Sequence, residues 1–343
     1  METLETPSAT ATSTTTSAPP ISVSAFRLGG PAQTSEGESA TIAQVVMDVS
    51  GQAITHIGVR FQSFFFGSGQ VSYAPFEAIA EATPDMVTLS VTRQELDERM
   101  KATPTGFKLS VETQVLLDAK RVGRISQLIF ENESQRLWRL VIDRGLSGEW
   151  SAPASAVTQL DARQISLSSK GATATTLLTP YVSDNELAED ARRAIENYTP
   201  LRIDLKGIDI YVIAGVVWLE GHVSSDLNRR LAADQLRTVN GIAELHNELI
   251  PDNELATSVS QALARDPRTA HAHIGVYPTL GVVHLRGVVA TNEVRQAAGQ
   301  IAQATPGVKT VLDEIRVNPM GDVLPTLAGV TGEEDHIPGG GEE

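Results

Sequence analysis

Residues 215–223 read GVVWLEGHV, and residues 281–289 repeat this phrase as GVVHLRGVV. The two copies lie 66 residues apart (281 − 215), and the same offset relates Gly241 to Gly307 (307 − 241). A repeat of this length indicates a small folded module rather than an isolated turn motif. The C-terminal half is therefore predicted to hold two copies of one module.

Each module is predicted to be α+β, with the element order α-β-β-α-β. In the first copy, apolar residues at helical spacing precede two strands, which Ala214-Gly215 joins as a two-residue turn. A second helix stops at Asn240-Gly241, and a last strand follows. In the second copy, the hairpin turn is predicted at residues 278–281, two residues longer than in the first. The expected elements of the first copy are helices 185–198 and 226–239 and strands 206–213, 216–223 and 242–250.

The N-terminal half is predicted to be all-β. Short apolar runs alternate there with Gly and Ser/Asp clusters, a pattern typical of a small barrel or sandwich. A later block also echoes an earlier one, because WSAPASAV at 150–157 resembles SYAPFEAI at 72–79. The triplet FKL at 107–109 likewise resembles FRL at 26–28. These echoes predict two small β-barrel units in succession.

Shifts in composition divide this multidomain chain. The first twenty residues are rich in Ser, Thr, Ala and Pro, a composition typical of disorder. The predicted organisation is a disordered segment 1–20, a first β unit 21–92, a linker 93–106, a second β unit 107–168, a linker 169–183, the two α+β modules 184–251 and 252–318, and a disordered acidic tail 319–343.

Composition excludes several classes of protein. The net charge of −15 over 343 residues disfavours binding to nucleic acid and to anionic membrane surfaces, because both need a basic protein surface. The absence of cysteine excludes disulfides, thiolate chemistry and Cys-ligated zinc. No stretch approaches the roughly 18 apolar residues of a membrane span, and the N-terminus lacks the basic and apolar regions of a signal peptide. A cytoplasmic location is therefore expected.

The glycines of the repeated phrase are predicted to be structural. A phosphate-binding P-loop is excluded, because no Lys-Ser/Thr pair follows Gly221 and no helix begins there. We expect a turn glycine followed by a strand glycine that packs close under a helix. The glycines assigned to this structural motif are Gly215, Gly221, Gly241, Gly281, Gly287 and Gly307.

Strand alternation predicts an apolar surface on the first module. With a two-residue turn, Tyr211 lies opposite Trp218 and Ile213 opposite Val216, all on one face of the sheet. Both helices of an α-β-β-α-β unit can cover the other face, which leaves this one bare. An exposed apolar patch of this kind usually marks a contact site for a protein or lipid. The alternative is a cross-strand pair that only stabilises the hairpin.

The corresponding face of the second module is predicted to be polar. It carries His271, His273, His284 and Arg286, and His284 takes the place of Trp218. Three histidines on adjacent strands suit a metal ion, but no carboxylate is evident beside them and Arg286 opposes a cation. A solvated face is the favoured interpretation. The divergence between the copies favours the first module as the binding partner.

Three consecutive aromatic residues form a weaker candidate in the first β unit. Phe64, Phe65 and Phe66 end a predicted strand, so their side chains must point to both faces. They are interpreted as a docking tip or as a plug that closes the barrel.

The C-terminal copies resemble the BON domain (bacterial OsmY and nodulation). This resemblance implies a lipid- or protein-binding module linked to envelope and osmotic stress, and no enzymatic activity. Its matching residues are Gly215, Val216, Leu219, Gly221, Val223, Gly241, Asn247 and Leu249 in the first copy, and Gly281, Val282, Leu285, Gly287, Val289, Gly307, Val308, Asp313 and Ile315 in the second.

The N-terminal half is similar to PRC barrels, the small β-barrels of photosynthetic reaction-centre H subunits and ribosome-maturation factors. The similarity rests on Val122-Gly123-Arg124-Ile125, on Trp138–Ile142 as the next strand, and on Ala152-Pro153 before a turn. The first unit departs from the pattern at Ile42-Ala43-Gln44-Val45. The resemblance implies an interaction platform.

The sequence predicts a non-catalytic binding or scaffold protein. None of the seven histidines lies in a Ser/His/Asp or HExxH context, and no cofactor or metal is expected. The expected partner is another protein or a second copy of the chain. A role in stress or at the envelope and peripheral membrane contact are further expectations. Two alternatives stay open: a phospholipid or small-ligand binding module, and an assembly factor for ribosomes or photosynthetic complexes that acts through the barrels.

Overall fold

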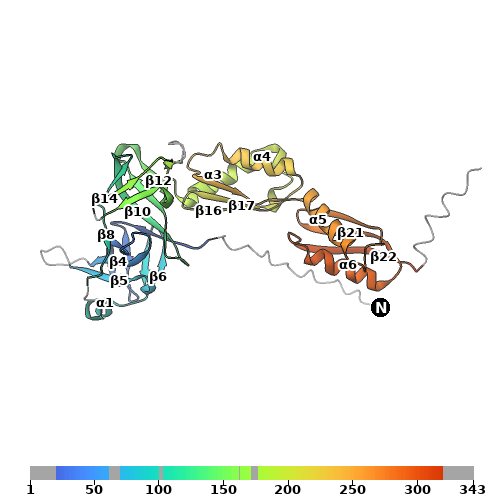
Figure 1. Cartoon of the computed structure of the whole chain (residues 1–343), viewed down its shortest axis with the longest axis horizontal. Coiled ribbons are helices and arrows are strands. Elements are labelled where there is room, and N and C mark those ends of the chain that lie inside the picture. The colour runs from blue at the N-terminus through green and yellow to red at the C-terminus, as the bar shows by residue number, and fades with distance from the viewer. Residues whose placement is uncertain (1–20, 62–69, 100–102, 162, 171–176, 320–343) are drawn as a thin grey trace, which may run out of the picture. The chain divides into compact units, whose positions relative to one another are not determined.

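The computed structural model describes residues 21–61, 70–99, 103–161, 163–170 and 177–319. The chain divides into two compact units, Met1–Tyr181 and Val182–Glu343, each with its own elements (Figure 1). The predicted N-terminal disordered segment, nearly all of the acidic tail, and Phe64, Phe65 and Phe66 lie outside the described residues. None of the helices within the described ranges has the length and apolar character of a membrane span.

The first unit contains two sheets with the same strand order. One sheet runs β5-β4-β3-β2-β7-β6, and the other runs β12-β11-β10-β9-β14-β13, so the predicted repeat of the N-terminal half is present in the fold. The first block comprises β1 (Val23–Arg27), β2 (Pro31–Gln33), β3 (Ser39–Met47), β4 (Ile54–Phe61), β5 (Val71–Pro75), β6 (Ile79–Ala82), β7 (Val87–Leu89) and the helix α1 (Arg93–Arg99). The second comprises β8 (Phe107–Leu109), β9 (Gln114–Leu117), β10 (Lys120–Glu131), β11 (Leu137–Asp143), β12 (Glu149–Pro153), β13 (Val157–Leu160), β14 (Gln164–Leu167) and β15 (Thr179–Pro180).

The two blocks exchange their first strands. Strand β1 of the first block pairs with β10 of the second, and β8 of the second block pairs with β3 of the first. The similar triplets FRL and FKL thus begin in β1 and β8, and each of these strands pairs with the strand at the same place in the other block's sheet. Arg27 at the end of β1 stabilises this exchange through a bidentate ion pair with Glu149, in which the two N–O distances are 2.9 and 3.1 Å.

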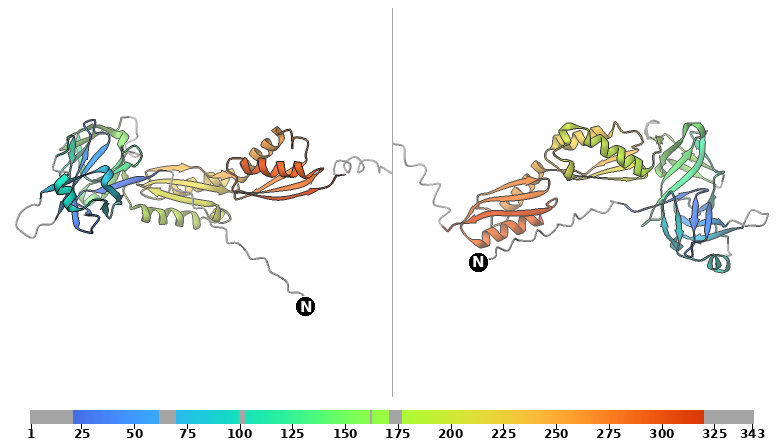
Figure 2. Two further views of the ribbon diagram at one scale, coloured as in Figure 1. Left: turned by 90° about the horizontal axis from the view of Figure 1, so that it is seen from below. Right: turned by 180° about the vertical axis from the view of Figure 1, so that it is seen from behind.

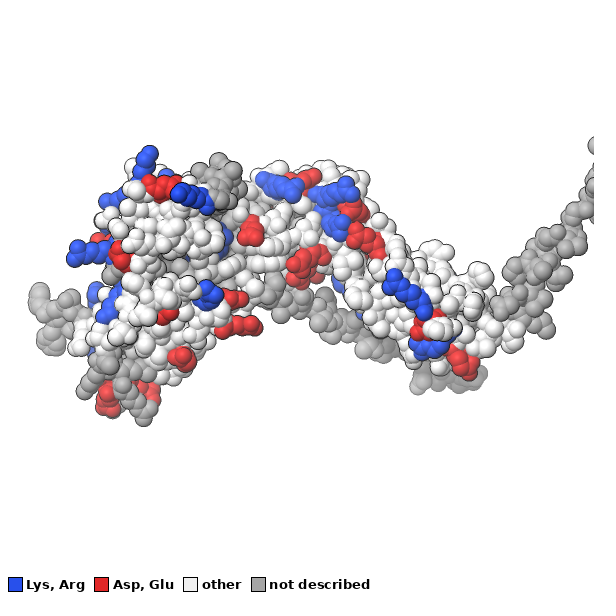
Figure 3. Space-filling model, in the orientation of Figure 1, with Lys and Arg blue, Asp and Glu red and all other residues white. Residues whose placement is uncertain are grey.

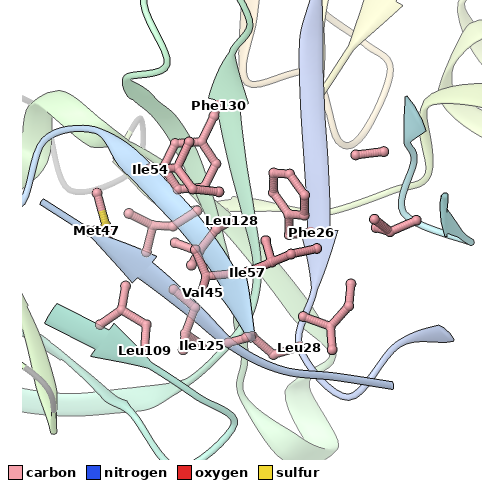
Figure 4. Close-up of a cluster of buried hydrophobic side chains, with 14 of the residues drawn as sticks. Phe26, Leu28, Val45, Met47, Ile54, Ile57, Leu109, Ile125, Leu128 and Phe130 are labelled. Carbon is pink, nitrogen blue, oxygen red and sulfur yellow. The ribbon is translucent and has the colours of Figure 1, made fainter. Parts of the chain in front are cut away.

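This exchange gives the first unit a single hydrophobic core. Phe26 from β1 packs edge-to-face on Phe130 from β10, with ring centroids 5.9 Å apart. Side chains of both blocks, including Val45, Leu109 and Leu128, join the same cluster (Figure 4). Neither strand path closes into a ring among the described residues, so the prediction of two closed barrels is wrong. Its physical reason is that each block takes a strand from the other instead of closing on itself.

The second unit contains the two predicted α-β-β-α-β modules. Each has an antiparallel hairpin whose second strand pairs in parallel with the last strand. In each copy both helices cover one face of that copy's own sheet (Figure 2). The first copy comprises α3 (Asp184–Glu196), β16 (Ile208–Ile213), β17 (Val216–Val223), α4 (Asp226–Leu236), β18 (Glu244–Asn247) and β19 (Ile250–Pro251). The second comprises α5 (Asp252–Arg265), β20 (Ile274–Thr279), β21 (Val282–Val289), α6 (Asn292–Ala304) and β22 (Thr310–Val317).

The core face of each module follows the predicted alternation. Val217, Leu219 and Val223 are buried under the helices in the first copy, and Val283 and Leu285 are buried in the second. Hydroxyl side chains cap three of the helices by accepting a backbone N–H, as this position favours. These caps are Ser183, Ser225 and Thr291.

The predicted length of the second hairpin turn is wrong. Thr279 pairs with Val282, so the turn is Leu280-Gly281, with the same two residues as Ala214-Gly215 in the first copy. The two copies differ instead in the segment before the hairpin. The helix starts are 68 residues apart (252 − 184) while the turns are 66 apart (280 − 214), so that segment is two residues shorter in the second copy.

Candidate functional site

The repeated glycines hold the backbone of each module. Gly221 has a φ of +101°, and a Cβ added there would lie 2.1 Å from the Gly207 carbonyl oxygen. Gly287 has a φ of +147°, and its Cβ would lie 2.5 Å from the His273 oxygen. The strand glycine is therefore needed for close approach to the neighbouring backbone, and the prediction that it packs under a helix is wrong.

An aspartate at the start of the first helix braces the hairpin turn in each copy, and Asp252 is buried while Asp184 is half-buried. The Asp184 carboxylate accepts hydrogen bonds from the N–H groups of Ala214 and Gly215, at 2.8 and 3.1 Å. Asp252 does the same for Leu280 and Gly281, at 2.8 and 3.2 Å. We did not predict this role from the sequence. The signal was present, because both aspartates open the same pentapeptide, DNELA, at 184–188 and 252–256.

The outer face of the first module is not bare. The predicted register is confirmed, with Tyr211 opposite Trp218 and Ile213 opposite Val216. Trp218, however, is only 6% exposed and Val216 is buried, while Tyr211 and Ile213 are half-buried. The parallel strand β18 also brings the His246 imidazole into a stack on the Trp218 ring, with centroids 5.2 Å apart. The prediction of an exposed apolar patch on this face is therefore wrong.

The outer face of the second module is the accessible one. Tyr277, Val288 and Leu312 come from its three strands and are 54%, 45% and 43% exposed. Alternation places them on the face opposite the core residues Val283 and Leu285. Three large apolar side chains on one uncovered sheet face are more than the scattered exposure normal for a protein surface.

An ion-pair network crosses the middle of this open face, which we define by Tyr277, His284, Arg286, Val288, Leu312 and Glu314. Glu314 contacts His284 Nδ1 at 2.8 Å and Arg286 Nε at 2.6 Å, and the Arg286 guanidinium lies 5.6 Å from the Tyr277 ring centroid. Hydrogen bonds from Arg286 and then from His284 hold the pKa of the Glu314 carboxyl below its ordinary value. Sequence reasoning found no carboxylate here, because the parallel register that sets Glu314 beside Arg286 is not visible in the sequence.

The predicted placement of three histidines on adjacent strands of one face is wrong. His284 lies on β21, whereas His271 and His273 are exposed in the turn before β20. Within the part of the chain that the structure describes, no group of three or more His, Cys, Asp or Glu side chains could hold a metal ion.

The comparisons with known proteins agree with this architecture. The BON domain family model matches residues 183–250 and 251–319. Residues 183–319 are two tandem BON domains. BON domains are binding modules, generally associated with membranes or the envelope, and are not enzymes.

Solved structures give only weak similarity. Two structures of CdsD, a structural protein of the type III secretion system of Chlamydia trachomatis, match at 17% identity. One covers 47% of this chain and 72% of that chain with a TM-score of 0.36, and the other, of the C-terminal domain, covers 41% and 69% with a TM-score of 0.35. Such a likeness supports no conclusion about partners. No curated protein matches the chain.

The two BON domains meet at a buried histidine. His222 in β17 is 4% exposed, and its Nε2 lies 2.6 Å from the Gly307 carbonyl oxygen of the second domain. Its ring fills the space beside Gly281, where an added Cβ would lie 2.8 Å from ring atoms. The Arg229–Glu254 ion pair, at 3.0 Å, adds a second link between the domains. Nδ1 of His222 is buried and has no hydrogen-bond partner among the described residues.

Acid is expected to weaken this junction. Burial lowers the pKa of His222 below its ordinary 6.5, with the hydrogen bond to Gly307 and the nearby Asp252 and Asp209 opposing the shift and Lys309 adding to it. Below pH 6.5 the unfolded chain therefore binds more protons at His222 than the folded chain does. The contribution of neutral His222 to the free energy of unfolding is fully present above pH 6.5 and is lost as the pH falls through the folded-state pKa.

Urea unfolding of the second unit at pH 7.5 and 5.5 measures this effect. The acid-induced loss of stability is expected to be larger in the wild type than in His222→Gln, which takes up no proton at this position. Equal pH dependence in the two proteins would exclude His222 as the group responsible.

Proposed function

We propose that this chain is a non-catalytic interaction protein whose second BON domain binds protein through the open face. One observation carries the proposal: Tyr277, Val288 and Leu312 are exposed together on a sheet whose two helices lie on the other side. Exposed apolar patches that include an aromatic residue are typical of protein interfaces.

A second copy of the chain is the partner that the charges fit best. The open face carries both signs, with Arg286 beside Glu314 and Arg316 next along the same strand. A two-fold contact places the same patch on both partners, so an arginine of one copy can meet the glutamate of the other. A partner with a single sign of charge would place a like charge against either Glu314 or the two arginines.

Replacing two residues of the open face tests this function. The double variant Tyr277→Ser/Leu312→Ser is expected to weaken self-association at least tenfold, because a buried aromatic anchor contributes about 2 kcal/mol or more to an interface. Sedimentation equilibrium gives the dissociation constant. The matched control is Ile203→Ser/Leu227→Ser, which removes two exposed apolar side chains from the first BON domain.

The two possible failures are distinguishable. A wild-type chain that stays monomeric at high concentration would reject self-association. Equal association of the open-face variant and the wild type would reject the open face as its site.

Several finer expectations belong to this proposal. These stay predictions: the PRC-barrel resemblance of the first unit, a role in stress or at the envelope, an assembly role, and a cytoplasmic location with peripheral membrane contact. The half-buried Tyr211 and Ile213 make the first BON domain the weaker candidate for binding.

A further inference from the structure

The first unit carries an arginine-lined groove that the BON domains do not explain. The groove has a volume of about 510 Å³ and lies between the start of β10 and the end of β11. Its lining includes Arg121 and Arg124 from β10 and Arg144 from the turn after β11. Gly123 brings the strands close together, since a Cβ there would lie 2.3 Å from the Asp143 carbonyl oxygen.

The groove is locally basic in an acidic protein. Three arginines line it against one carboxylate, Asp143, whose Oδ1 accepts the N–H of Gly145 at 2.8 Å. Arg124 has a long ion pair to Glu112, at 3.8 Å between exposed side chains, so its guanidinium is barely neutralised. Acidic and basic side chains are interspersed over the visible face of the molecule (Figure 3). Distant acidic groups are screened beyond about 8 Å at physiological salt, so the local charge governs what binds here.

An apolar residue projects beside these arginines. Leu146 stands at the tip of the β11–β12 hairpin and is fully exposed, with a relative exposure of 110%. The loop is closed by Arg144 N–H donating to the Gly148 oxygen at 3.0 Å. Trp150 Nε1 donates to the Ser147 oxygen at 2.9 Å, and the Arg144 guanidinium lies 4.7 Å from the Trp150 ring centroid. The tip is thus held in a fixed form that points Leu146 away from the sheet.

We propose that this arginine groove and the Leu146 tip form a docking site for the surface of an anionic phospholipid bilayer. Phosphate groups lie at the outer level of such a bilayer and acyl chains lie beneath them, which matches guanidinium groups around a protruding apolar side chain. A free phosphate ion would use the arginines but would gain nothing from Leu146. An acidic protein segment would meet the same charges without the apolar layer below.

Vesicle co-sedimentation of the full chain tests the site. Wild-type protein is expected to bind vesicles of phosphatidylglycerol and phosphatidylcholine, to lose binding as salt is raised, and to ignore phosphatidylcholine alone. Each of Arg121→Gln, Arg124→Gln and Arg144→Gln is expected to lower the partition coefficient about fivefold. Leu146→Ser is expected to lower it about tenfold.

A matched control separates the groove from total charge. The triple variant Arg60→Gln/Arg192→Gln/Arg202→Gln removes the same charge from exposed positions elsewhere and is expected to bind as the wild type does. Equal loss of binding in this control and in the triple variant Arg121→Gln/Arg124→Gln/Arg144→Gln would overturn the proposal. No binding of the wild type to anionic vesicles would also overturn it. Full competition by inorganic phosphate together with an unaffected Leu146→Ser variant would assign the groove to a free anion instead.

Discussion

Replacing Gly221 with alanine is expected to destabilise the first BON domain by more than about 4 kcal/mol, the range of backbone clashes and strained φ values. The added Cβ would lie 2.1 Å from the Gly207 carbonyl oxygen, and both atoms belong to paired backbone that cannot move aside singly. Domains of this size have a free energy of unfolding of only about 5–15 kcal/mol. Calorimetry is therefore expected to show the transition of this domain at a much lower temperature, or not at all.

The chain supplies its own control for this prediction. Gly299 lies inside the helix α6, and a Cβ added there meets nothing within 4 Å. Gly299→Ala is expected to stabilise its domain by roughly 0.5–1 kcal/mol, because alanine loses less backbone entropy in a helix. Similar effects of the two substitutions would contradict the assignment of Gly221 as a close-approach residue.

Replacing Asp252 with alanine is expected to loosen the β20–β21 hairpin of the second BON domain. Its buried carboxylate accepts the N–H groups of both turn residues, and its loss leaves two donors without a partner. Unpaired buried donors cost about 1–3 kcal/mol each, so a loss of about 3 kcal/mol is expected. Hydrogen exchange of peptides that cover residues 274–289 measures the opening directly.

Asp234→Ala is the matched control for this second prediction. Asp234 on α4 forms an exposed ion pair with Arg237, the residue that caps the end of this helix, and such pairs contribute about 0–1 kcal/mol. Exchange rates in the hairpin that rise no more for Asp252→Ala than for Asp234→Ala would show that the aspartate does not brace the turn.

The sequence predicted the local geometry of the BON domains well, because the deciding information is local. The two-residue turn at Ala214-Gly215 sets the register of the first hairpin, and alternation then assigns Val217 and Leu219 to the core. In the second copy, Pro278 suggested a longer turn, yet the backbone pairing runs through it to Thr279. Pro278 is tolerated because β20 is an edge strand of its sheet.

What the sequence could not predict depends on contacts between distant residues. The alternation of side chains along a strand assigns Trp218 to the outer face, but it does not show which residues pack against it. The burial of Trp218 was therefore not predicted. The pairing of Glu314 with Arg286 depends on a parallel register between β21 and β22, which no turn fixes. The echoes in the N-terminal half identify equivalent strands, but they do not say which strands pair, and so the exchange of β1 and β8 was missed.

That exchange sets the order in which the first unit can be completed during synthesis. Val23 of β1 pairs with Glu131, which the ribosome adds 108 residues later (131 − 23), and Met47 pairs with Phe107, 60 residues later (107 − 47). The strand pairing of Phe26 must therefore wait until β10 has emerged, and before then its ring has only Phe76 of its own block as an aromatic neighbour. Neither repeat can complete its own sheet alone, so the earlier block is expected to leave strand edges unpaired for as long as translation of the later block lasts. Both exchanged strand pairings join residues far apart in the sequence, so folding of the first unit is expected to be slow compared with that of a unit held by local contacts.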